Sequence, residues 1–380
     1  IRCIFSVSPM AKQIPFFLRC GCFGWDGRPS RSWTAEARGA ILTERMLQQV
    51  MDGAASRIVP WNPDEWKSIE TLQEPGKSRA LVGSVERKAD NLTLAVKRLP
   101  NRWIKTGHGE FAKSSPQSSE KPWVDIGMLR YLNALGFPHV CDLMGIFRDD
   151  DFTYVATPLA TEGDLFHWVE HASCPPGKER ESIIRPMMVQ VFSAVKELHE
   201  IGIAHRDISL ENILLTRRPD GGPQIKVIDF GMATLSQRCS AEVRGKQAYQ
   251  APEMHTDIEY DAFLADIFAA GVVLYAMALS DYPWTCTRAG SCSMFDFIHS
   301  WGFPEFIKNR KCRAASKTYI VQVLSPSLCE LVEGLLELHP EERFCLGESC
   351  FDVQGPNGRW SAWDMAWMKR ANSRETCALW

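Results

Sequence analysis

The middle of the chain reads His205-Arg206-Asp207-Ile208-Ser209-Leu210-Glu211-Asn212, and Asp229-Phe230-Gly231 follows 17 residues after Asn212. The carboxylate of Asp207 is able to accept a proton from a hydroxyl group. Asn212 and Asp229 offer the oxygen ligands that Mg²⁺ prefers. In-line phosphoryl transfer requires such a set, a base for the nucleophile and two side chains that hold metal. The two segments at this spacing therefore predict a phosphoryl-transfer site.

The overall composition is that of an ordinary globular protein. The chain has 380 residues, of which 45% are apolar and 23% charged, and its net charge is −3. This length suits two compact domains or one domain with two lobes. Basic residues are scattered without a long run, so we expect no nucleic-acid partner.

The 13 cysteines are an odd number without regular spacing. A disulfide framework is not expected in a chain of this length, so we expect reduced cysteines and an intracellular, cytoplasmic location. The longest apolar run, Phe263 to Leu279, contains Asp266 and is short for a membrane span. We therefore expect a buried core helix and no membrane span.

The spacing of apolar residues changes along the chain from alternating to helical. Two strands are expected between Leu81 and Leu99, with a turn at Asp90-Asn91. Further expectations are a helix at Ala35 to Ala55, a surface loop at Pro100 to Pro122, a helix at Asp125 to Leu135, strands at Cys141 to Phe147 and Phe152 to Thr157, and helices at Ile183 to Ile201 and Ser327 to Leu338. Strands followed by helices predict an α+β architecture in two lobes, with a hinge near Thr157 to Ala160.

The loop at His205 to Asn212 and the Asp229-Phe230-Gly231 tripeptide resemble the HRD and DFG motifs of the eukaryotic protein kinase superfamily, Ser/Thr type. Three later segments are similar to family motifs in the family's order. Gly245 to Glu253 resembles G-T-x-x-Y-x-A-P-E, Asp266 to Gly271 resembles D-x-W-x-x-G, and His339 to Arg343 resembles D-P-x-x-R. The resemblance implies that Asp266 anchors the catalytic-loop backbone and that Arg343 pairs with Glu253.

The resemblance covers roughly residues 65 to 350 and implies a bilobal protein kinase fold. The small β-rich lobe would span 65–157 and the larger helical lobe 158–350. Residues 1–64 would form an N-terminal extension, disordered in part over Ile1 to Arg31, and 351–380 a tail.

The family's lysine and glycine-rich loop have counterparts with departures. Lys97 ends Leu94-Ala95-Val96-Lys97 and would orient the ATP phosphates. The loop would run from Ser78 to Val85, where only Gly83 is kept and Val85 would cover the adenine. Ser78 and Gly83 would allow close approach of backbone N–H groups to phosphate. An alternative places the loop at Gly76-Lys77-Ser78.

The remaining nucleotide contacts follow from the same resemblance. Asp125 is the first candidate for the acid that pairs with Lys97, and the alternatives are Glu120 or no partner. Thr157 would be the gatekeeper, while the carbonyl of Pro158 and the N–H of Ala160 would bond the adenine. Asp164 would bind the ribose, or would serve as an acid at a helix N-terminus.

The catalytic loop itself departs from the family at Ser209, where Ser/Thr kinases carry a lysine. Lys246 stands where the facing segment normally has threonine, so we expect its ammonium group to replace the missing charge. Glu242 falls where many kinases carry an activating phosphate that Arg206 would grip. A carboxylate there predicts activation without loop phosphorylation, with Thr234, Ser236 and Ser240 as alternative phosphorylation sites.

These features together predict a kinase that uses ATP and Mg²⁺ to phosphorylate Ser or Thr of protein substrates. The alternative is a pseudokinase that acts as a nucleotide-binding or scaffold module, because the glycine loop, Ser209 and the missing glutamate all depart from the family. Within the superfamily, the single glycine, Ser209 and the Gly-Lys-x-x-Tyr pattern from Gly245 to Tyr249 resemble FIKK-type kinases, although the motif that names them is absent.

Overall fold

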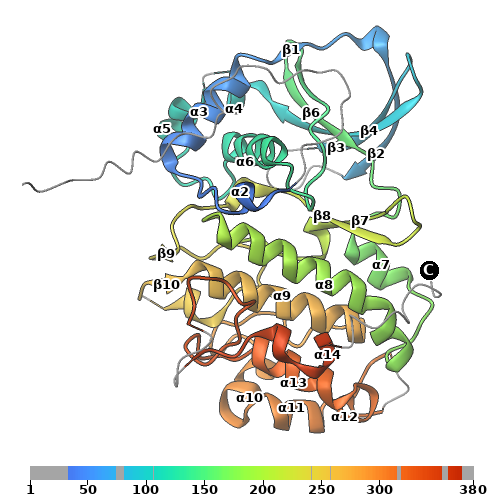
Figure 1. The fold of residues 1–380 in the computed structure, drawn as a ribbon, viewed down its shortest axis with the longest axis vertical. Helices are drawn as coiled ribbons and strands as arrows, with labels where there is room; N and C mark the ends of the chain where they lie inside the picture. The colour runs from blue at the N-terminus through green and yellow to red at the C-terminus, as the bar shows by residue number, and fades with distance from the viewer. Residues whose placement is uncertain are drawn as a thin grey trace, which may run out of the picture.

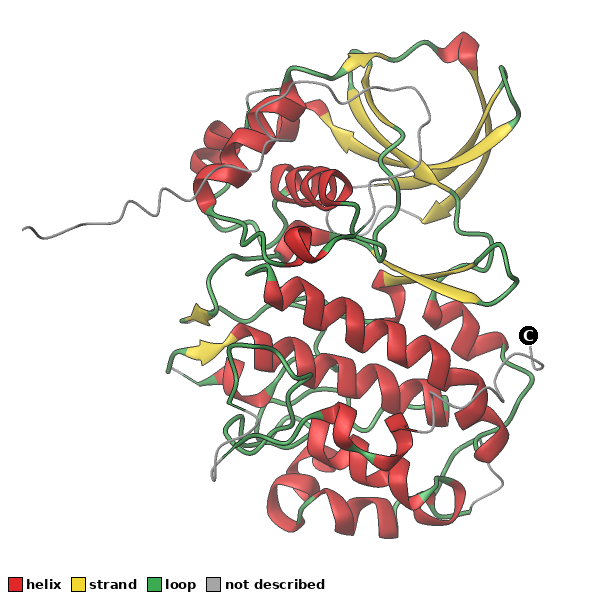
Figure 2. Cartoon of the chain, in the orientation of Figure 1, coloured by secondary structure: helices red, strands yellow, loops and turns green. Residues whose placement is uncertain are grey.

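The computed structural model describes residues 33–73, 81–105, 107–240, 242–256, 258–314, 318–352 and 358–369. A small lobe built around a curved sheet lies above a larger helical lobe (Figure 1). Strands are concentrated in the small lobe and helices in the large one (Figure 2). The predicted α+β, two-lobed architecture is confirmed. The expectation of disorder at 1–31 lies outside the described residues.

The small lobe contains a six-stranded sheet in the order β1-β5-β6-β4-β3-β2. All neighbours are antiparallel except β1 and β5, which run parallel. The strands are β1 (Val59–Pro60), β2 (Trp66–Gln73), β3 (Leu81–Arg87), β4 (Leu92–Pro100), β5 (Gly145–Arg148) and β6 (Phe152–Pro158).

The two faces of this sheet have different tasks. Leu94 and Val96 pack with Trp66, Phe147 and Ala156 into a small apolar cluster on one face. Because side chains alternate along a strand, Lys97 points to the other face. That face is covered by helix α6 (Pro122–Leu135).

The predicted hairpin is present, and its turn confirms the expectation at Asp90-Asn91. Asn91 takes a left-handed conformation with φ +57, which asparagine adopts more readily than most residues. The strand expected from Cys141 starts only at Gly145. The side chain of Asn133 bonds Cys141 O and Leu143 N at 3.0 and 2.9 Å, which ties this stretch to α6 instead of to the sheet.

Two expectations for the helices of the small lobe were wrong. Residues 100–122, expected as a surface loop, contain α4 (Asn101–Ile104) and α5 (His108–Ser114), which bury Ile104 and Phe111. The single helix expected from Ala35 is two, α2 (Ala35–Arg38) and α3 (Glu44–Ala55). The hydroxyl of Thr43 caps the second helix by accepting from Met46 N at 3.3 Å, so the chain begins a new helix there.

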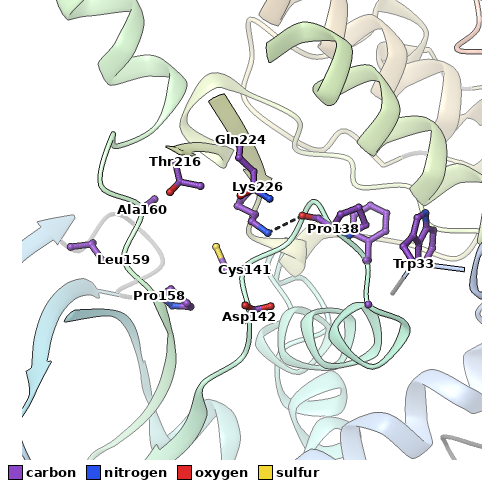
Figure 3. A pocket seen from close by; sticks show the side chains of 12 residues that line it. Trp33, Pro138, Cys141, Asp142, Pro158, Leu159, Ala160, Thr216, Gln224 and Lys226 are labelled. Carbon is purple, nitrogen blue, oxygen red and sulfur yellow. Dashed lines mark hydrogen bonds between the residues drawn. The ribbon is translucent and has the colours of Figure 1, made fainter. Parts of the chain in front are cut away.

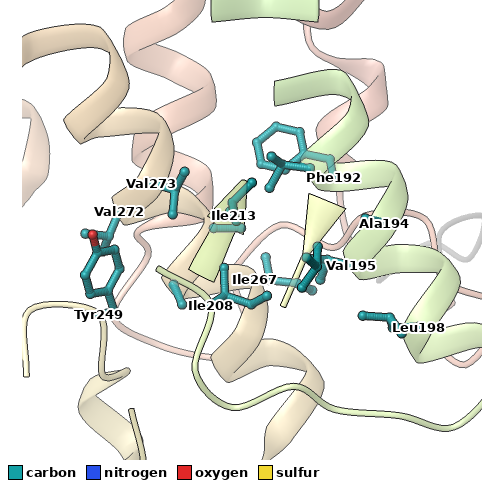
Figure 4. Close-up of a cluster of buried hydrophobic side chains, with 14 of the residues drawn as sticks. Phe192, Ala194, Val195, Leu198, Ile208, Ile213, Tyr249, Ile267, Val272 and Val273 are labelled. Atoms are coloured by element: carbon teal, nitrogen blue, oxygen red, sulfur yellow. The ribbon is translucent and has the colours of Figure 1, made fainter. Parts of the chain in front are cut away.

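The large lobe is organised around α9 (Ala262–Leu279), in which every residue is buried. Among the described residues it is the helix whose length and hydropathy match a membrane span, but it is wholly enclosed by protein. The buried core helix expected there is confirmed. It packs on α8 (Lys178–Glu200) and α13 (Pro326–Leu335), and Figure 4 shows apolar side chains such as Phe192, Ile267 and Val272 meeting in this region.

The other elements complete the lobe. They are α7 (Leu165–His171), α10 (Ser293–Trp301), α11 (Phe303–Asn309), α12 (Ile320–Val323), α14 (Ala366–Lys369), the hairpin β7 (Ile213–Arg217) and β8 (Pro223–Val227), the pair β9 (Arg238–Cys239) and β10 (Tyr260–Asp261), and the 3₁₀ turns η1 (Pro63–Glu65), η2 (Leu210–Asn212), η3 (Phe230–Met232), η4 (Pro252–His255) and η5 (Ala362–Asp364). Trp367 of α14 is fully buried against this lobe. The domain boundaries at residues 65 and 350 stay predictions.

Candidate active site

The loop between α8 and β7 is held by a carboxylate of the core helix. Asp266, 2% exposed in α9, accepts from the backbone N of His205 at 2.6 Å and of Arg206 at 2.7 Å. Two charge-assisted hydrogen bonds of this kind fix the loop strongly. They also support the unusual backbone of Arg206, whose φ is +66. The contact expected between Asp266 and the loop backbone is therefore present.

Asp207 follows directly and presents one free oxygen. Its Oδ2 accepts from the amide Nδ2 of Asn212 at 2.7 Å, while its buried Oδ1 has no hydrogen-bond partner among the described residues. Burial raises the pKa of Asp207, and the charges of Lys246 and His205 offset part of that rise. A buried carboxylate oxygen left without a donor costs free energy unless a ligand supplies one. Protein donors thus satisfy the Asp207 carboxylate only in part.

Asn212 is oriented by the same contacts. Its Nδ2 donates to both the carbonyl and Oδ2 of Asp207, at 2.8 and 2.7 Å, which leaves its amide oxygen available. Its own backbone carbonyl accepts from Ile228 N at 3.0 Å. This bond links the loop to the residue just before Asp229, so the two proposed metal-holding side chains belong to one connected unit.

Lys97, Asp125 and Asp229 form a second cluster that joins both lobes. The Nζ of Lys97 lies 2.8 Å from Asp125 Oδ2 and 3.2 Å from Asp229 Oδ1. Burial alone would lower the pKa of Lys97, but the two carboxylates outweigh it and raise that pKa. For Asp229 burial would raise the pKa, and the charge and hydrogen bond of Lys97 hold it below its usual range. Lys97 and Asp229 are therefore both charged at neutral pH.

The ion pair between Lys97 and Asp125, left open by the sequence, is present, and Glu120 does not take that place. Asp125 does more than pair, because its Oδ1 accepts from Phe230 N at 2.9 Å. Glu120 precedes α6 next to Gly231, and its pKa is raised by burial and by the charge of Asp229. A single aspartate thus connects the strand lysine with the Asp229-Phe230-Gly231 segment.

Val85 was expected to cover the adenine, and this expectation was wrong. Val85 pairs with Leu94 and packs against the small apolar cluster, on the face of the sheet away from Lys97. Val82, which pairs with Lys97 itself, lies on the nucleotide-facing side. Leu94 lies three positions from Lys97 on β4, so the two side chains point to opposite faces, and Val85 shares the face of Leu94 because the two residues pair.

Gly83 lies inside β3, paired with Val96. An added Cβ at Gly83 would come within 3.1 Å of Glu70 O, so glycine permits close approach of β2 at its irregular pairing. Ser78 lies outside the described residues, as does the alternative Gly76-Lys77-Ser78. Those residues fall in the connection from Gln73 to Leu81.

The hinge residues end β6 and lead to α7. Thr157 pairs with Ala95, on the same sheet face as Lys97, as the gatekeeper expectation requires. Asp164 is the N-cap of α7 and accepts from His167 N at 2.7 Å. Burial raises the pKa of Asp164, while that backbone bond acts in the opposite direction. Asp164 therefore lies at a helix N-terminus, which is one of the two roles expected for it.

A cavity of about 460 Å³ lies beside the hinge (Figure 3). Pro158, Leu159 and Ala160 line it, together with Cys141 and Lys226. None of the groups that would handle phosphate borders this cavity. It is distinct from the cluster around Lys97 and Asp229.

Lys246 reaches into the catalytic loop from the facing segment. Its Nζ donates to Ser209 Oγ at 2.6 Å and lies 3.9 Å from Asp207 Oδ2 and 3.7 Å from Glu211 Oε2. Gly245 makes this approach feasible. Its φ is +79, and an added Cβ would lie 2.9 Å from Arg206 O and 3.4 Å from Asp207 Oδ1.

Two ion pairs hold the segment that contains Lys246. Arg206 Nη2 lies 2.5 Å from Glu242 Oε2, and these contacts keep the pKa of Glu242 below its usual range although burial opposes them. Arg343, fully buried, binds both oxygens of Glu253 at 2.6 and 2.9 Å. Both pairs are those that the resemblance to the kinase family implied. The two-oxygen geometry of the second pair is the stronger kind.

One buried cluster behind the loop was not anticipated. His199 bridges two carboxylates, with Nδ1 at 2.8 Å from Glu348 and Nε2 at 3.3 Å from Asp266. Burial alone would lower the pKa of His199, but the two partners raise it to about 9. Glu348 also accepts from Leu346 N at 2.7 Å. No sequence signal links positions 199 and 348, because the fold alone brings them together.

The oxygen groups fit a magnesium ion. The available amide oxygen of Asn212 and the carboxylate of Asp229 are two hard oxygen ligands, the number that Mg²⁺ commonly takes from protein at phosphate sites. No cluster of three acidic, His or Cys side chains suited to a metal is found within the described residues. The site is therefore one in which substrate phosphates and water would complete the coordination.

The chain was compared with known proteins. Residues 78–352 match the family model described as protein kinase domain. The mouse testis-specific serine/threonine-protein kinase 5 is 32% identical over 215 residues, which cover 55% of this chain and 51% of the mouse protein. The serine/threonine-protein kinase SAPK3 of Oryza sativa subsp. indica is 32% identical over 219 residues, which cover 57% of this chain and 59% of the rice protein. The chain thus spans about half the length of the curated relatives it matches.

Proposed function

Because this chain belongs to the protein kinase family, we propose that it transfers the γ-phosphate of ATP to Ser or Thr side chains of protein substrates. The observation that carries the proposal is the partly exposed carboxylate of Asp207, which Asn212 orients through a hydrogen bond of 2.7 Å. Family membership alone does not supply this geometry. The Ser/Thr preference is supported by the names of the two relatives, each a serine/threonine-protein kinase.

Each residue has a defined task in this proposal. The carboxylate of Asp207 accepts the substrate hydroxyl proton, and Lys97 holds the α- and β-phosphates while Asp125 holds Lys97. Asn212 and Asp229 would hold Mg²⁺, which shields phosphate charge when it is bound. Lys246 supplies the positive charge that Ser209 lacks, close to Asp207 Oδ2.

Gly83, Pro158, Ala160 and Asp164 complete the proposed nucleotide contacts. The carbonyl of Pro158 and the N–H of Ala160 would face the adenine, because β6 ends at Pro158 and frees the following backbone. Val82 is proposed in place of Val85 as the residue above the base, since it shares the face of Lys97. Ser78 and Gly83 are proposed to allow backbone N–H groups to approach the phosphates.

A cytoplasmic location is part of the proposal. Nine described cysteines are free thiols, which supports a reducing compartment. The expected lack of a nucleic-acid partner and of a membrane span, and the resemblance to FIKK-type kinases, stay predictions.

The test is phosphate incorporation from Mg²⁺-ATP, into the protein itself and into a mixture of Ser- and Thr-containing peptides. Asp207→Asn and Asp229→Ala are the matched controls, and incorporation that these variants abolish supports the proposal. The placement of Gly83 inside the sheet favours the alternative of a nucleotide-binding scaffold. Thermal stabilisation by ATP without any incorporation would establish that alternative and reject the kinase.

A further inference from the structure

The residues before the sheet contact both lobes. Leu42 N donates to Ile201 O at 2.9 Å, just past the end of α8. Tyr131 of α6 donates its hydroxyl to Ala40 O at 2.9 Å and is itself fully buried. Figure 1 shows α3 beside α6, with α6 lying between α3 and the sheet. The segment from Trp33 to Ala55 therefore backs the helix that carries Asp125.

The contact between α3 and α6 is apolar and close. Four residues of α3, spaced as one face of a helix, are buried: Leu47, Val50, Met51 and Ala54. Opposite them α6 has Gly127, at which an added Cβ would lie 2.8 Å from Met51 Cγ and 3.0 Å from Leu47 Cδ1. Only glycine lets the two helices approach this closely without displacement.

Gly127 and Asp125 lie on opposite faces of α6. Two residues correspond to about 200° around an α-helix, so a side chain at 127 points away from one at 125. Tyr131, one turn after Gly127, shares the face toward α3. Pressure from α3 on this face acts in the direction that brings Asp125 toward Lys97.

Displacement of α6 toward Lys97 matters because Asp125 has a short side chain. An aspartate has one methylene fewer than glutamate, yet Asp125 reaches Lys97 at 2.8 Å and Phe230 N at 2.9 Å. The backbone of α6 must therefore lie nearer to β4 than a glutamate would need. A further contact joins α5 to α3, where Nε2 of His108 lies 3.1 Å from Oδ1 of Asp52.

We propose that α3 is a built-in positioning element, in which Leu47 and Met51 press on Gly127 and hold Asp125 against Lys97 and Phe230. This inference rests on the proposed kinase function for its effect on turnover, but not for its effect on the position of α6. Leu47 and Met51 contact no substrate in this view and act only through Asp125.

The test compares Leu47→Ala/Met51→Ala with the same variant carrying Asp125→Glu. The double alanine variant is expected to lose at least about tenfold in kcat/KM for ATP, because α6 relaxes away from the sheet. The longer glutamate should then span the gap and restore several-fold, while Asp125→Glu in the unaltered protein should give no gain. Leu328→Ala/Leu331→Ala, which truncates two fully buried side chains in α13 of the large lobe, is the matched control and should leave kcat/KM unchanged.

Hydrogen exchange at Phe230 gives a readout without turnover. The amide of Phe230 is bonded by Asp125, so it should exchange faster in the double alanine variant and slow again with Asp125→Glu. The same effect of Asp125→Glu in both backgrounds, or unchanged exchange at Phe230, would overturn the inference. If the double variant does not fold, Tyr131→Phe, which removes only the hydroxyl that bonds Ala40, is measured in the same way. A protein with no phosphoryl transfer that still shows the exchange pattern rejects the kinase proposal and retains this one.

Discussion

Lys246 donates a hydrogen bond to Ser209 Oγ at 2.6 Å across 37 positions of sequence. The lysine side chain is 40% exposed and lies within 4 Å of two carboxylates, Asp207 and Glu211. Ser209 is fully buried, so its hydroxyl holds the ammonium group in one place. An ammonium group from the facing segment thus lies beside position 209.

Replacement of this charge should slow phosphoryl transfer. We expect Lys246→Met to lower kcat by about 10²-fold, at the lower end of the range for one preorganised donor because the group is partly exposed. The measurement is steady-state incorporation from Mg²⁺-ATP. Turnover equal to that of the unaltered protein would show that Lys246 only faces solvent.

An exchange of the two side chains provides the sharper test. Ser209→Lys combined with Lys246→Thr moves the charge into the loop, as in the family pattern. This double variant should recover most of the activity that Lys246→Met loses, because a lysine at 209 can reach the same carboxylates. A double variant as slow as Lys246→Met would count against the replacement of one lysine by the other.

The pair of Arg206 and Glu242 predicts activity that does not depend on loop phosphorylation. The guanidinium of Arg206 is 5% exposed and would be left without this charge partner in Glu242→Gln. We expect kcat/KM to fall at least about fivefold, equivalent to roughly 1 kcal/mol for a pair with one exposed end. Ser240→Ala and phosphatase treatment should leave activity intact. Loss of activity after either treatment would identify a phosphate, and not Glu242, as the activating group.

The residues that lie within short motifs could be predicted from the sequence. The resemblance to short family motifs identified Asp207, Asn212, Asp229 and Asp266, and it also implied the pair of Glu253 and Arg343, which lie 90 positions apart. Asp125 was the first of the candidates for the partner of Lys97, with Glu120 or no partner as alternatives, and the ion pair in the structure decides between them. Each motif can be read within a few residues, whereas the contacts between motifs depend on the fold.

The parts that sequence reasoning missed depend on contacts between distant segments. The bond of Glu348 to His199 joins residues 149 positions apart. The role of α3 depends on the close approach of Leu47 to Gly127, which no period within either helix reveals. Val85 was misplaced for a different reason, because the register of the hairpin sets which strand residues share a face.

Substitution of Gly245 should lower kcat by more than the strain of a positive φ can explain. Alanine there must adopt φ +79, which costs about 1–2 kcal/mol, and its Cβ would also meet Arg206 O at 2.9 Å. Gly221, in the turn between β7 and β8, has φ +83 with nothing within 4 Å of an added Cβ, so it is the matched control. We expect both alanine variants to lose stability in urea, but only Gly245→Ala to lose most of its kcat. Equal kcat in the two variants would contradict the close contact with the catalytic loop.

The buried triad of His199, Asp266 and Glu348 predicts how stability depends on pH. The pKa of His199 is about 9 in the folded protein and near 6.5 in an unfolded chain. The folded state therefore binds more protons between these values, so stability falls as pH rises through this window. The contribution is complete below about pH 6.5 and lost above about pH 9. At about 1.36 kcal/mol per pH unit, a difference of about 2.5 units corresponds to at most ~3.4 kcal/mol.

Glu348→Gln separates this effect from other titrations. The substitution removes one of the two charges that raise the pKa of His199, so burial should then lower that pKa. Urea unfolding measured from pH 6 to 9.5 should show a steeper loss of stability for the unaltered protein than for the variant. Because Asp266 holds the backbone of His205 and Arg206, kcat should fall in the same window. Parallel stability curves for the two proteins would mean that His199 is already neutral at pH 7.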